Sequence, residues 1–357
     1  MKTAIILIAI LHGLIHLLGF LKAFKFAQIE QLTAPISPAL GWVWLLGTIL
    51  FLVFAILGFL ENPSAGYFGI LAVLISQVLI FSVWQDAKFG TIPNIIILIT
   101  AIQMLFISNW NQKLEDEKAA FREKTESVEL RKIRELPKPL IKWLNRIGFD
   151  ETNPMTMAEI HQSAELKMKP SQDDWKLATA FQLTRVNYPA FHWEVEMQML
   201  PGIKIFGRDQ CLNGKGEMLI LLGGIFPIVE EKGEKIDEGS IQRLLGELVW
   251  IPSLALHPAI SWQELDGNSA KASLTIGETI GTGTFFFDEN GDFIRFEALR
   301  FYENKPESKR FPWILTVQEY STFQGIKIPS TMRATWRFEE NDWTWLKLKI
   351  ENIQYDF

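Results

Sequence analysis

The sequence predicts an α+β protein, in which a four-helix transmembrane domain precedes a curved antiparallel β half-barrel with one covering helix. Three observations lead to this prediction. Four apolar runs occupy residues 1–110, each with the length of a membrane-crossing helix. From about residue 156 apolar and polar residues alternate with a period of two, which is typical of strands. One amphipathic stretch, residues 237–251, interrupts the strands and is expected to lie across the sheet as a lid.

The composition indicates a membrane part joined to a soluble part. The chain has 357 residues, so more than one domain is expected. Its mean hydropathy is +0.11 although 21% of the residues are charged. We assign residues 1–110 to the transmembrane domain, 111–135 to a charged helical connector and 136–357 to the β-rich domain. The net charge of -6 argues against a nucleic-acid partner. The single cysteine, Cys211, excludes an intrachain disulfide and any multi-cysteine metal site, and we expect no cofactor.

The apolar runs cover residues 5–21, 40–60, 67–84 and 92–108, and each can cross a hydrocarbon core roughly 30 Å thick. Trp42, Trp44, Trp84 and Trp110 lie near run ends, where aromatic rings favour the headgroup region. This pattern predicts a multi-pass protein of the bacterial cytoplasmic membrane, with the lipid bilayer as a partner. The basic residues of the short loops place the β-rich domain outside the cytoplasm, whereas those after the last run place it inside. We expect the extracytoplasmic orientation.

His12 and His16 are four residues apart and share one face of the first apolar helix. Two imidazoles at this spacing could bind a metal or haem, because polar residues inside a membrane are functional candidates. The alternative is hydrogen bonding between helices, helped by Gly13 and Gly19, which permit close approach. We favour the hydrogen bonds.

The connector and the start of the β-rich domain have helical patterns. Residues 111–135 are highly charged with sparse apolar positions, which predicts an exposed helix. Leu136-Pro-Lys-Pro139 ends this helix. A second, short helix is expected over 139–147, with Gly148 at its C-terminal cap.

Turn residues divide the β-rich domain into roughly a dozen strands. They are expected over residues 160–169, 175–185, 190–199, 203–212, 217–222, 260–265, 270–276, 281–287, 293–301, 313–320, 326–338 and 343–355, with a short segment around 225–230 before the helix. Asp288-Glu-Asn-Gly-Asp292 is a hairpin turn, and the Gly-rich stretches at 214–216 and 277–283 fit hairpins better than phosphate loops. A sheet of this size must curl, and with a covering helix it would enclose a cavity.

The covering helix has a defined start, face and end. Asp237 is expected to cap its first turn. Pro252 ends it, because the residue before a proline disfavours helix. One apolar stripe should face the sheet, formed by Ile241, Leu244, Leu245, Leu248 and Val249.

The polar pairs near this helix have two interpretations each. Arg208 and Asp209 could anchor a ligand at a cavity mouth, but a structural ion pair beside a bulge at Gly207 is favoured. Arg243 and Glu247 could face a ligand headgroup, but a surface pair is favoured. Candidate ligand-binding residues are Arg208, Asp209, Leu244, Leu248, Trp250, Trp262, Phe285 and Phe287.

No motif supplies a catalytic centre. The sequence lacks Gly-x-Ser-x-Gly, His-Glu-x-x-His and a phosphate-binding loop, so a non-enzymatic role is favoured. His257 with the nearby acids Glu264 and Asp266 has no accompanying nucleophile motif.

From about Trp175 the chain resembles an uncharacterised bacterial family of membrane-anchored or free domains. The resemblance rests on Pro189-Ala-Phe-His-Trp, Met199-Leu-Pro-Gly-Ile, Gly207-Arg-Asp, Glu247-Leu-Val-Trp-Ile-Pro-Ser and Phe287-Asp-Glu-Asn-Gly, with His12-Gly-Leu-Ile-His in the membrane part. It implies no activity and no catalytic residues. His192 and Cys211 stand where other residues are expected, which argues against an essential role. In strand-helix-strand order the chain is similar to lipoprotein-carrier (LolA-like) half-barrels, which implies a cavity for an apolar ligand.

The leading hypothesis is therefore a membrane-anchored cell-envelope domain that binds a lipid, an acyl chain or another apolar small molecule. One alternative is a membrane redox or transport module that uses His12 and His16, with the sheet domain as a sensor. Another is a structural module that binds a partner through a sheet edge.

Overall fold

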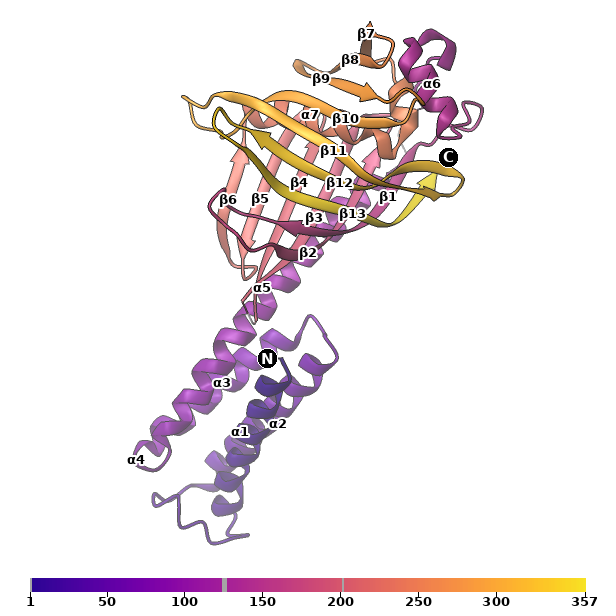
Figure 1. The fold of residues 1–357 in the computed structure, drawn as a ribbon. Coiled ribbons are helices and arrows are strands. Elements are labelled where there is room, and N and C mark those ends of the chain that lie inside the picture. Colours follow the sequence, from indigo (N-terminus) through magenta and orange to yellow (C-terminus); the bar gives the residue numbers. More distant parts are fainter. Residues whose placement is uncertain (1, 124–126, 201) are drawn as a thin grey trace. The chain divides into compact units, whose positions relative to one another are not determined.

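A computed structural model describes residues 2–123, 127–200 and 202–357. The chain forms two compact units, Met1–Asp116 with Gly223–Ile225, and Glu117–Leu222 with Phe226–Phe357. The first unit is helical and the second is dominated by one sheet (Figure 1). The predicted α+β class is confirmed.

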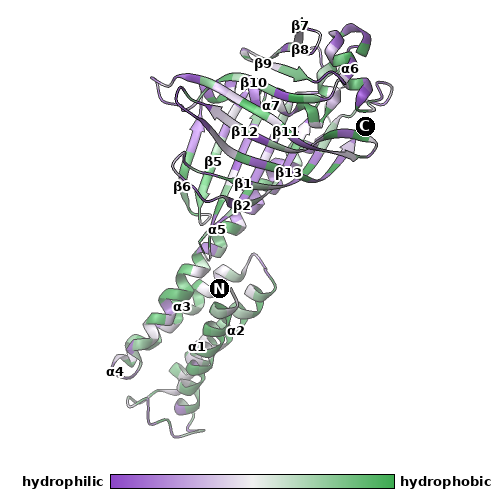
Figure 2. Ribbon diagram, in the orientation of Figure 1, coloured by the Kyte–Doolittle hydropathy of each residue, from purple (hydrophilic) through white to green (hydrophobic). Residues whose placement is uncertain are grey.

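The first unit contains the four predicted apolar helices. The helices are α1 (Lys2–Ala23), α2 (Pro38–Phe59), α3 (Ala65–Ser82), the short α4 (Trp84–Ala87) with the 3-10 turn η1 (Lys88–Gly90), and α5 (Thr91–Arg122). Among the described residues, four helical segments are long and apolar enough to cross a membrane, the last running through α4 and α5. Their apolar character is visible in Figure 2. These helices are compatible with membrane insertion.

Glycines bring α1 close to α2, as expected. A Cβ at Gly13 would lie 2.8 Å from Phe51 Cβ, and one at Gly19 would overlap the Trp44 ring. Trp44 is accordingly buried beneath α1, whereas Trp42 is exposed. Small residues therefore set the separation of these two helices.

The second unit contains a single antiparallel sheet of 13 strands in the part of the chain that the structure describes. The strands are β1 (Met157–Leu166), β2 (Lys176–Arg185), β3 (Ala190–Leu200), β4 (Ile203–Leu212), β5 (Lys215–Leu222), β6 (Phe226–Lys232), β7 (Ile260–Asp266), β8 (Ser269–Ile276), β9 (Thr279–Phe287), β10 (Phe293–Phe301), β11 (Arg310–Phe323), β12 (Ile326–Arg337) and β13 (Asp342–Asp356). The expected hairpin at Asp288–Asp292 is present, with Asp288 Oδ1 accepting from the Asp292 amide at 2.8 Å.

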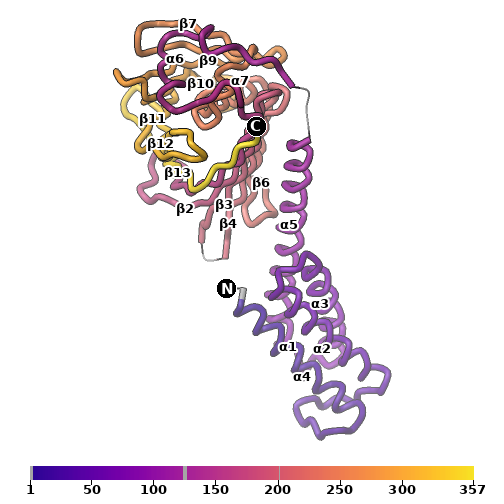
Figure 3. The backbone as a smooth tube through the Cα atoms, turned by 90° about the vertical axis from the view of Figure 1, so that its right-hand side faces the viewer, coloured from indigo at the N-terminus to yellow at the C-terminus, as the bar shows by residue number. Residues whose placement is uncertain are grey.

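Consecutive strands pair with each other in two series, β1 to β6 and β7 to β13. The strand order is β6-β5-β4-β3-β2-β1-β13-β12-β11-β10-β9-β8-β7, so the first and last strands pair in the middle of the sheet. We call β1–β6 the N-terminal arm and β7–β13 the C-terminal arm. The two edge strands, β6 and β7, flank helix α7 (Glu234–Glu247) in the sequence. The sheet curls, and α7 packs on β4 and β5 of one arm and on β9 and β10 of the other (Figures 1 and 3).

Helix α7 differs from the prediction at both ends. It begins at Glu234, because Gly233 with φ 113° turns the chain from β6 into the helix. Asp237 is therefore not the cap: its carboxylate accepts from the Gly216 amide at 2.8 Å and from Lys215 Nζ at 2.9 Å. After Glu247 the chain tightens into the 3-10 turns η3 (Leu248–Trp250) and η4 (Pro252–Leu256). The predicted apolar stripe from Ile241 to Val249 is buried, as expected.

The charged segment 111–135 is helical only in part. Its first residues are the last turns of α5, which end at Arg122. Residues 124–126 lie outside the described part of the chain, residues 127–132 form no helix, and η2 (Ile133–Glu135) is a single 3-10 turn. The short helix α6 (Lys138–Arg146) follows close to its expected position, and Gly148 takes φ 78° after it.

The end of α5 packs against strands rather than facing solvent. Phe121 is buried with Leu183 and Ala190. Lys118 pairs with Glu194 at 2.8 Å, and Arg122 pairs with Glu159 at 2.6 Å. The last turn of α5 is thus part of the second unit.

We predict that a methyl group at Gly281 destabilises the second unit. Its Cβ would lie 2.6 Å from Ile241 Cγ2 and 2.9 Å from the Gln242 amide nitrogen, so α7 would have to move away from β9. Gly281→Ala should lower the free energy of unfolding by about 2 kcal/mol, the usual cost of overpacking. Urea unfolding of the full-length protein in nanodiscs, followed by tryptophan fluorescence, measures this. The control is Gly267→Ala, whose Cβ meets nothing within 4 Å; equal effects would contradict the close packing of α7.

Candidate ligand-binding site

A cavity of about 430 Å³ lies in the second unit, between the sheet and α7. Its wall comes from β1, β3, β4 and β5 of the N-terminal arm, from β10–β13 of the C-terminal arm, and from one side of α7 with Trp250. This volume lies within the roughly 300–1,000 Å³ typical of small-molecule sites.

One part of the cavity wall is apolar. It includes Leu166, Met197 and Ile205, which form one buried cluster with Ala164 and Ala178, and against which Val195, Ile220, Trp345 and Leu346 pack. Four methionines, Met168, Met197, Met218 and Met332, also line the cavity. Flexible, polarizable methionine side chains can adapt to ligands of different shape.

The α7 side of the wall holds a buried ion network around Arg243. Its Nη1 lies 2.6 Å from Asp209 Oδ2 on β4, and its Nε lies 2.8 Å from Glu247 Oε1 one turn further along α7. Gln182 completes the network by accepting from Arg243 Nη2 at 3.2 Å and donating to Glu247 Oε2 at 2.9 Å. The guanidinium also lies 4.7 Å from the centroids of the Phe191 and Trp193 rings.

The network holds Arg243 charged. Burial acts against the charge, but the carboxylates of Glu247 and Asp209 hold the pKa of Arg243 above its ordinary value. The expected pair of Arg243 and Glu247 is present, but the prediction that it lies on the surface is wrong. The helical spacing of polar and apolar residues does not reveal that the polar side of α7 packs against β4.

The expectation for Arg208 and Asp209 also needs correction. They do not pair with each other, because successive residues of a strand point to opposite faces. Asp209 binds Arg243, whereas Arg208 Nη1 lies 3.1 Å from Glu217 Oε2. There is no bulge at Gly207, which pairs in register with both neighbouring strands.

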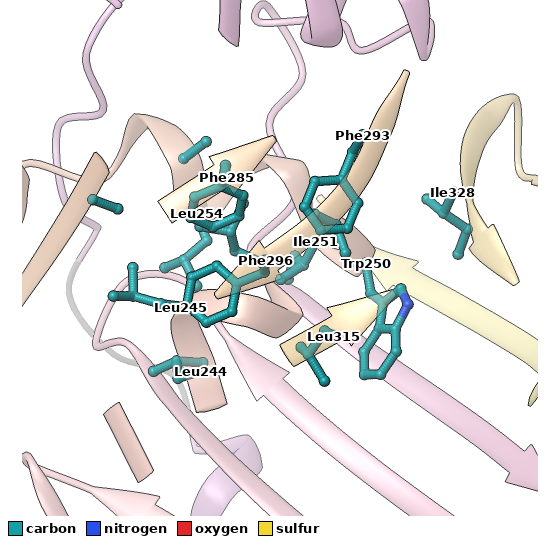
Figure 4. Close-up of a cluster of buried hydrophobic side chains, with 14 of the residues drawn as sticks. Leu244, Leu245, Trp250, Ile251, Leu254, Phe285, Phe293, Phe296, Leu315 and Ile328 are labelled. Atoms are coloured by element: carbon teal, nitrogen blue, oxygen red, sulfur yellow. The ribbon is translucent and has the colours of Figure 1, made fainter. Parts of the chain in front are cut away.

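The structure divides the predicted site residues into two groups. Arg208, Asp209 and Trp250 lie in the cavity wall. Leu244, Leu248, Phe285 and Phe287 are buried in the adjoining core, part of which Figure 4 shows, with Leu244 and Phe285 on opposite sides of Leu245 and Phe296. Trp262 packs against this core and donates from Nε1 to the Ala255 carbonyl at 3.0 Å.

Several wall residues were not singled out from the sequence. They are Arg300, Trp313 and Trp336 on the C-terminal arm. Gln182, which bonds Arg243 next to the cavity, was not singled out either. Strand alternation places Trp313 and Leu315 on one face, which was the available signal. Whether that face meets core or cavity depends on the curl of the sheet.

The remaining candidate side chains have structural partners. His12 Nε2 lies 3.0 Å from Asn94 Oδ1 and 3.3 Å from Ser76 Oγ, which are the interhelical hydrogen bonds expected. His16 Nδ1 lies 2.8 Å from the His12 carbonyl oxygen. Burial raises the pKa of the Cys211 thiol to about 12, so the thiolate nucleophile is disfavoured. His257 Nδ1 accepts from the Ala259 amide at 3.1 Å.

Comparison with known proteins places the chain in a family. Residues 126–348 match the sequence profile of a family of unknown function, DUF6544. The chain belongs to this family. The predicted membership of an uncharacterised family is thereby confirmed. No curated protein matches this DUF6544 member.

Among solved structures, the chain is similar to the crystal structure of a LolA superfamily protein from Nitrosomonas europaea. The TM-score is 0.34 and the sequence identity 11%, over 61% of this chain and 92% of that chain. The function of the DUF6544 chain is therefore inferred from its own cavity.

We predict that removal of the Arg243 charge is strongly destabilising. Arg243→Met would leave Asp209 and Glu247 buried without their cation, which typically costs about 3–5 kcal/mol of unfolding free energy. Arg337→Met is the matched control, because Arg337 and Asp342 form an exposed pair that contributes little to stability. Urea unfolding of both full-length variants compares them. A loss no larger than that of the control would show that the network does not stabilise the fold.

Proposed function

We propose that the protein is anchored in the cytoplasmic membrane by its apolar helices and binds an apolar ligand, a lipid or an acyl chain, in the sheet cavity without catalysis. The observation that carries this proposal is the cavity itself: its wall combines a cluster of aliphatic side chains with four methionines and six tryptophans. A folded interior normally leaves no void of this size.

The surface of the helices supports the membrane anchor. Large apolar side chains such as Leu11, Ile56, Val78 and Ile99 are each about 60% exposed or more, one on each of the four candidate membrane-crossing segments. Water would penalise such surfaces, whereas lipid tails would contact them without cost. The proposed orientation is extracytoplasmic, which the basic residues of the short loops favour and those after the last apolar run oppose.

The polar groups of the wall support binding rather than chemistry. Asp209 and Glu247 are buried carboxylates of the kind that could act as general bases, but both are bonded to Arg243. In this network the two carboxylates serve to neutralise the guanidinium.

The other hypotheses have weaker support. The network of His12, Ser76, Asn94 and Gln77 joins three helices through side-chain hydrogen bonds, which suits helix association as well as transport. For partner binding, β6 is an edge strand on which Phe226 is 65% exposed. Neither feature accounts for the cavity.

We predict that a photoactivatable fatty acid cross-links to the cavity wall. Membranes containing the full-length protein are loaded with a diazirine fatty acid and irradiated, and cross-linked peptides are mapped by mass spectrometry. Adducts are expected on cavity-lining strands such as β3, β5 and β12, and on the apolar helices, which serve as the internal positive control.

Ile220→Trp should abolish the adducts on the strands, because Ile220 lines the cavity and the larger side chain fills it. Ile280→Trp adds the same group at a position that is 54% exposed, and should leave the adducts unchanged. Adducts confined to the helices in the unmodified protein would refute a lipid site in the sheet.

A further inference from the structure

Arg300 on β10 is a partly buried cation that lines the cavity. Its guanidinium lies 4.3 Å from the centroid of the Trp313 ring and 5.9 Å from that of Trp336. Its Nε is shielded from solvent and has no hydrogen-bond partner, and within the described ranges no carboxylate lies within ion-pair distance of the side chain. A partly buried guanidinium whose N–H groups lack acceptors lowers the stability of the fold, unless a bound group supplies an acceptor and a negative charge.

The nearest acids are committed elsewhere. Asp209 and Glu247 bind Arg243, and Glu238 Oε2 accepts from Arg310 Nη2 at 2.7 Å. Burial lowers the pKa of Arg300 to about 10, so the group remains charged at neutral pH. The other lining cations differ from it: Arg208 and Arg243 pair with carboxylates, Lys235 donates to the Lys305 and Pro306 carbonyls, Lys167 lies over the Trp175 ring, and Arg333 is exposed.

Among the described residues of the cavity wall, more buried hydrogen-bond donors than acceptors lack a partner. The indole N–H groups of Trp313, Trp343 and Trp345 are buried without an acceptor, whereas Trp193 and Trp250 donate to Gln162 and to the Pro329 carbonyl. On the acceptor side, Asp209 Oδ1 is buried without a partner. A ligand that fits this wall must bring acceptor oxygens.

We propose that Arg300 binds the acidic head of an amphiphile, a carboxylate or a phosphate, while the apolar tail occupies the Met197–Ile220 part of the cavity. This inference rests on the proposed lipid-binding function and narrows its ligand class. A planar guanidinium can donate two parallel hydrogen bonds to either anion. Gly239 on α7 leaves the necessary room, since a Cβ there would lie 3.0 Å from Arg300 Nη2.

The test measures binding to the full-length protein in zwitterionic nanodiscs, with four probes: dodecanoate, dodecyl phosphate, dodecanol and inorganic phosphate. Arg300→Met should weaken binding of the two anionic amphiphiles roughly 10- to 100-fold, the usual worth of charge-assisted hydrogen bonds. Dodecanol binding should change less than about threefold. Arg300→Lys keeps the positive charge but loses the paired N–H donors of the guanidinium. Its affinity for the anionic amphiphiles should lie between those of the unmodified protein and Arg300→Met. Arg333→Met is the control, because this arginine also lines the cavity but is exposed.

The outcomes separate the two proposals. If the unmodified protein binds none of the amphiphiles, the proposed function itself fails. If it binds dodecanol as tightly as dodecanoate and Arg300→Met changes neither, lipid binding stands and this inference is wrong. Arg300-dependent binding of inorganic phosphate alone would indicate a free-anion site and overturn the headgroup assignment. If Arg300→Met does not fold, Arg300→Lys and Gly239→Ala, which displaces the guanidinium, give the same comparison.

Discussion

Helix α7 lies between the two arms of the sheet and contacts them through different chemistry. On the N-terminal arm the contacts are polar, from Asp237 to the β5 hairpin and from Arg243 to Asp209 and Gln182. On the C-terminal arm they are steric, since Gly246 fits against Phe296 and Leu315. The curl of the sheet would leave its inner face open to water without this helix. Helix α7 therefore closes one side of the cavity.

This division explains why core and cavity lie side by side. Toward the C-terminal arm the aromatic side chains of β9 and β10 fill the space beneath α7, with Phe285 and Phe296 fully buried. Toward the N-terminal arm the helix presents charged groups, which cannot be packed against a dry core unless they are paired. Arg243 is paired with two carboxylates, Asp209 and Glu247, and all three residues lie in the cavity wall. Arg300 Nε, by contrast, is buried without a hydrogen-bond acceptor.

Much of the fold could be predicted because it is encoded locally. Alternation and turn chemistry place the strands within a few residues, and at the β4–β5 turn Asn213 and Gly214 take the positive φ values of 52° and 75° that such hairpins require. The apolar stripe of α7 and the glycine contacts of α1 follow from spacing in the same way.

The site could be predicted only in part, because it joins residues that are distant in sequence. Asp209 and Arg243 are in different elements, and no local pattern states that they meet. Phe285 and Trp313 look alike as strand aromatics, yet one fills the core and the other lines the cavity. The bulge expected at Gly207 failed for a similar reason: the glycine leaves room for Val195 on the neighbouring strand, without interrupting the pairing.

Native mass spectrometry of the full-length protein released directly from its membranes shows whether a ligand occupies the cavity. We expect a retained adduct of one lipid or fatty acid per chain, lost when the cavity is filled at Ile220. A protein that carries only variable, non-stoichiometric lipid, equally in both forms, would contradict a ligand site beneath α7.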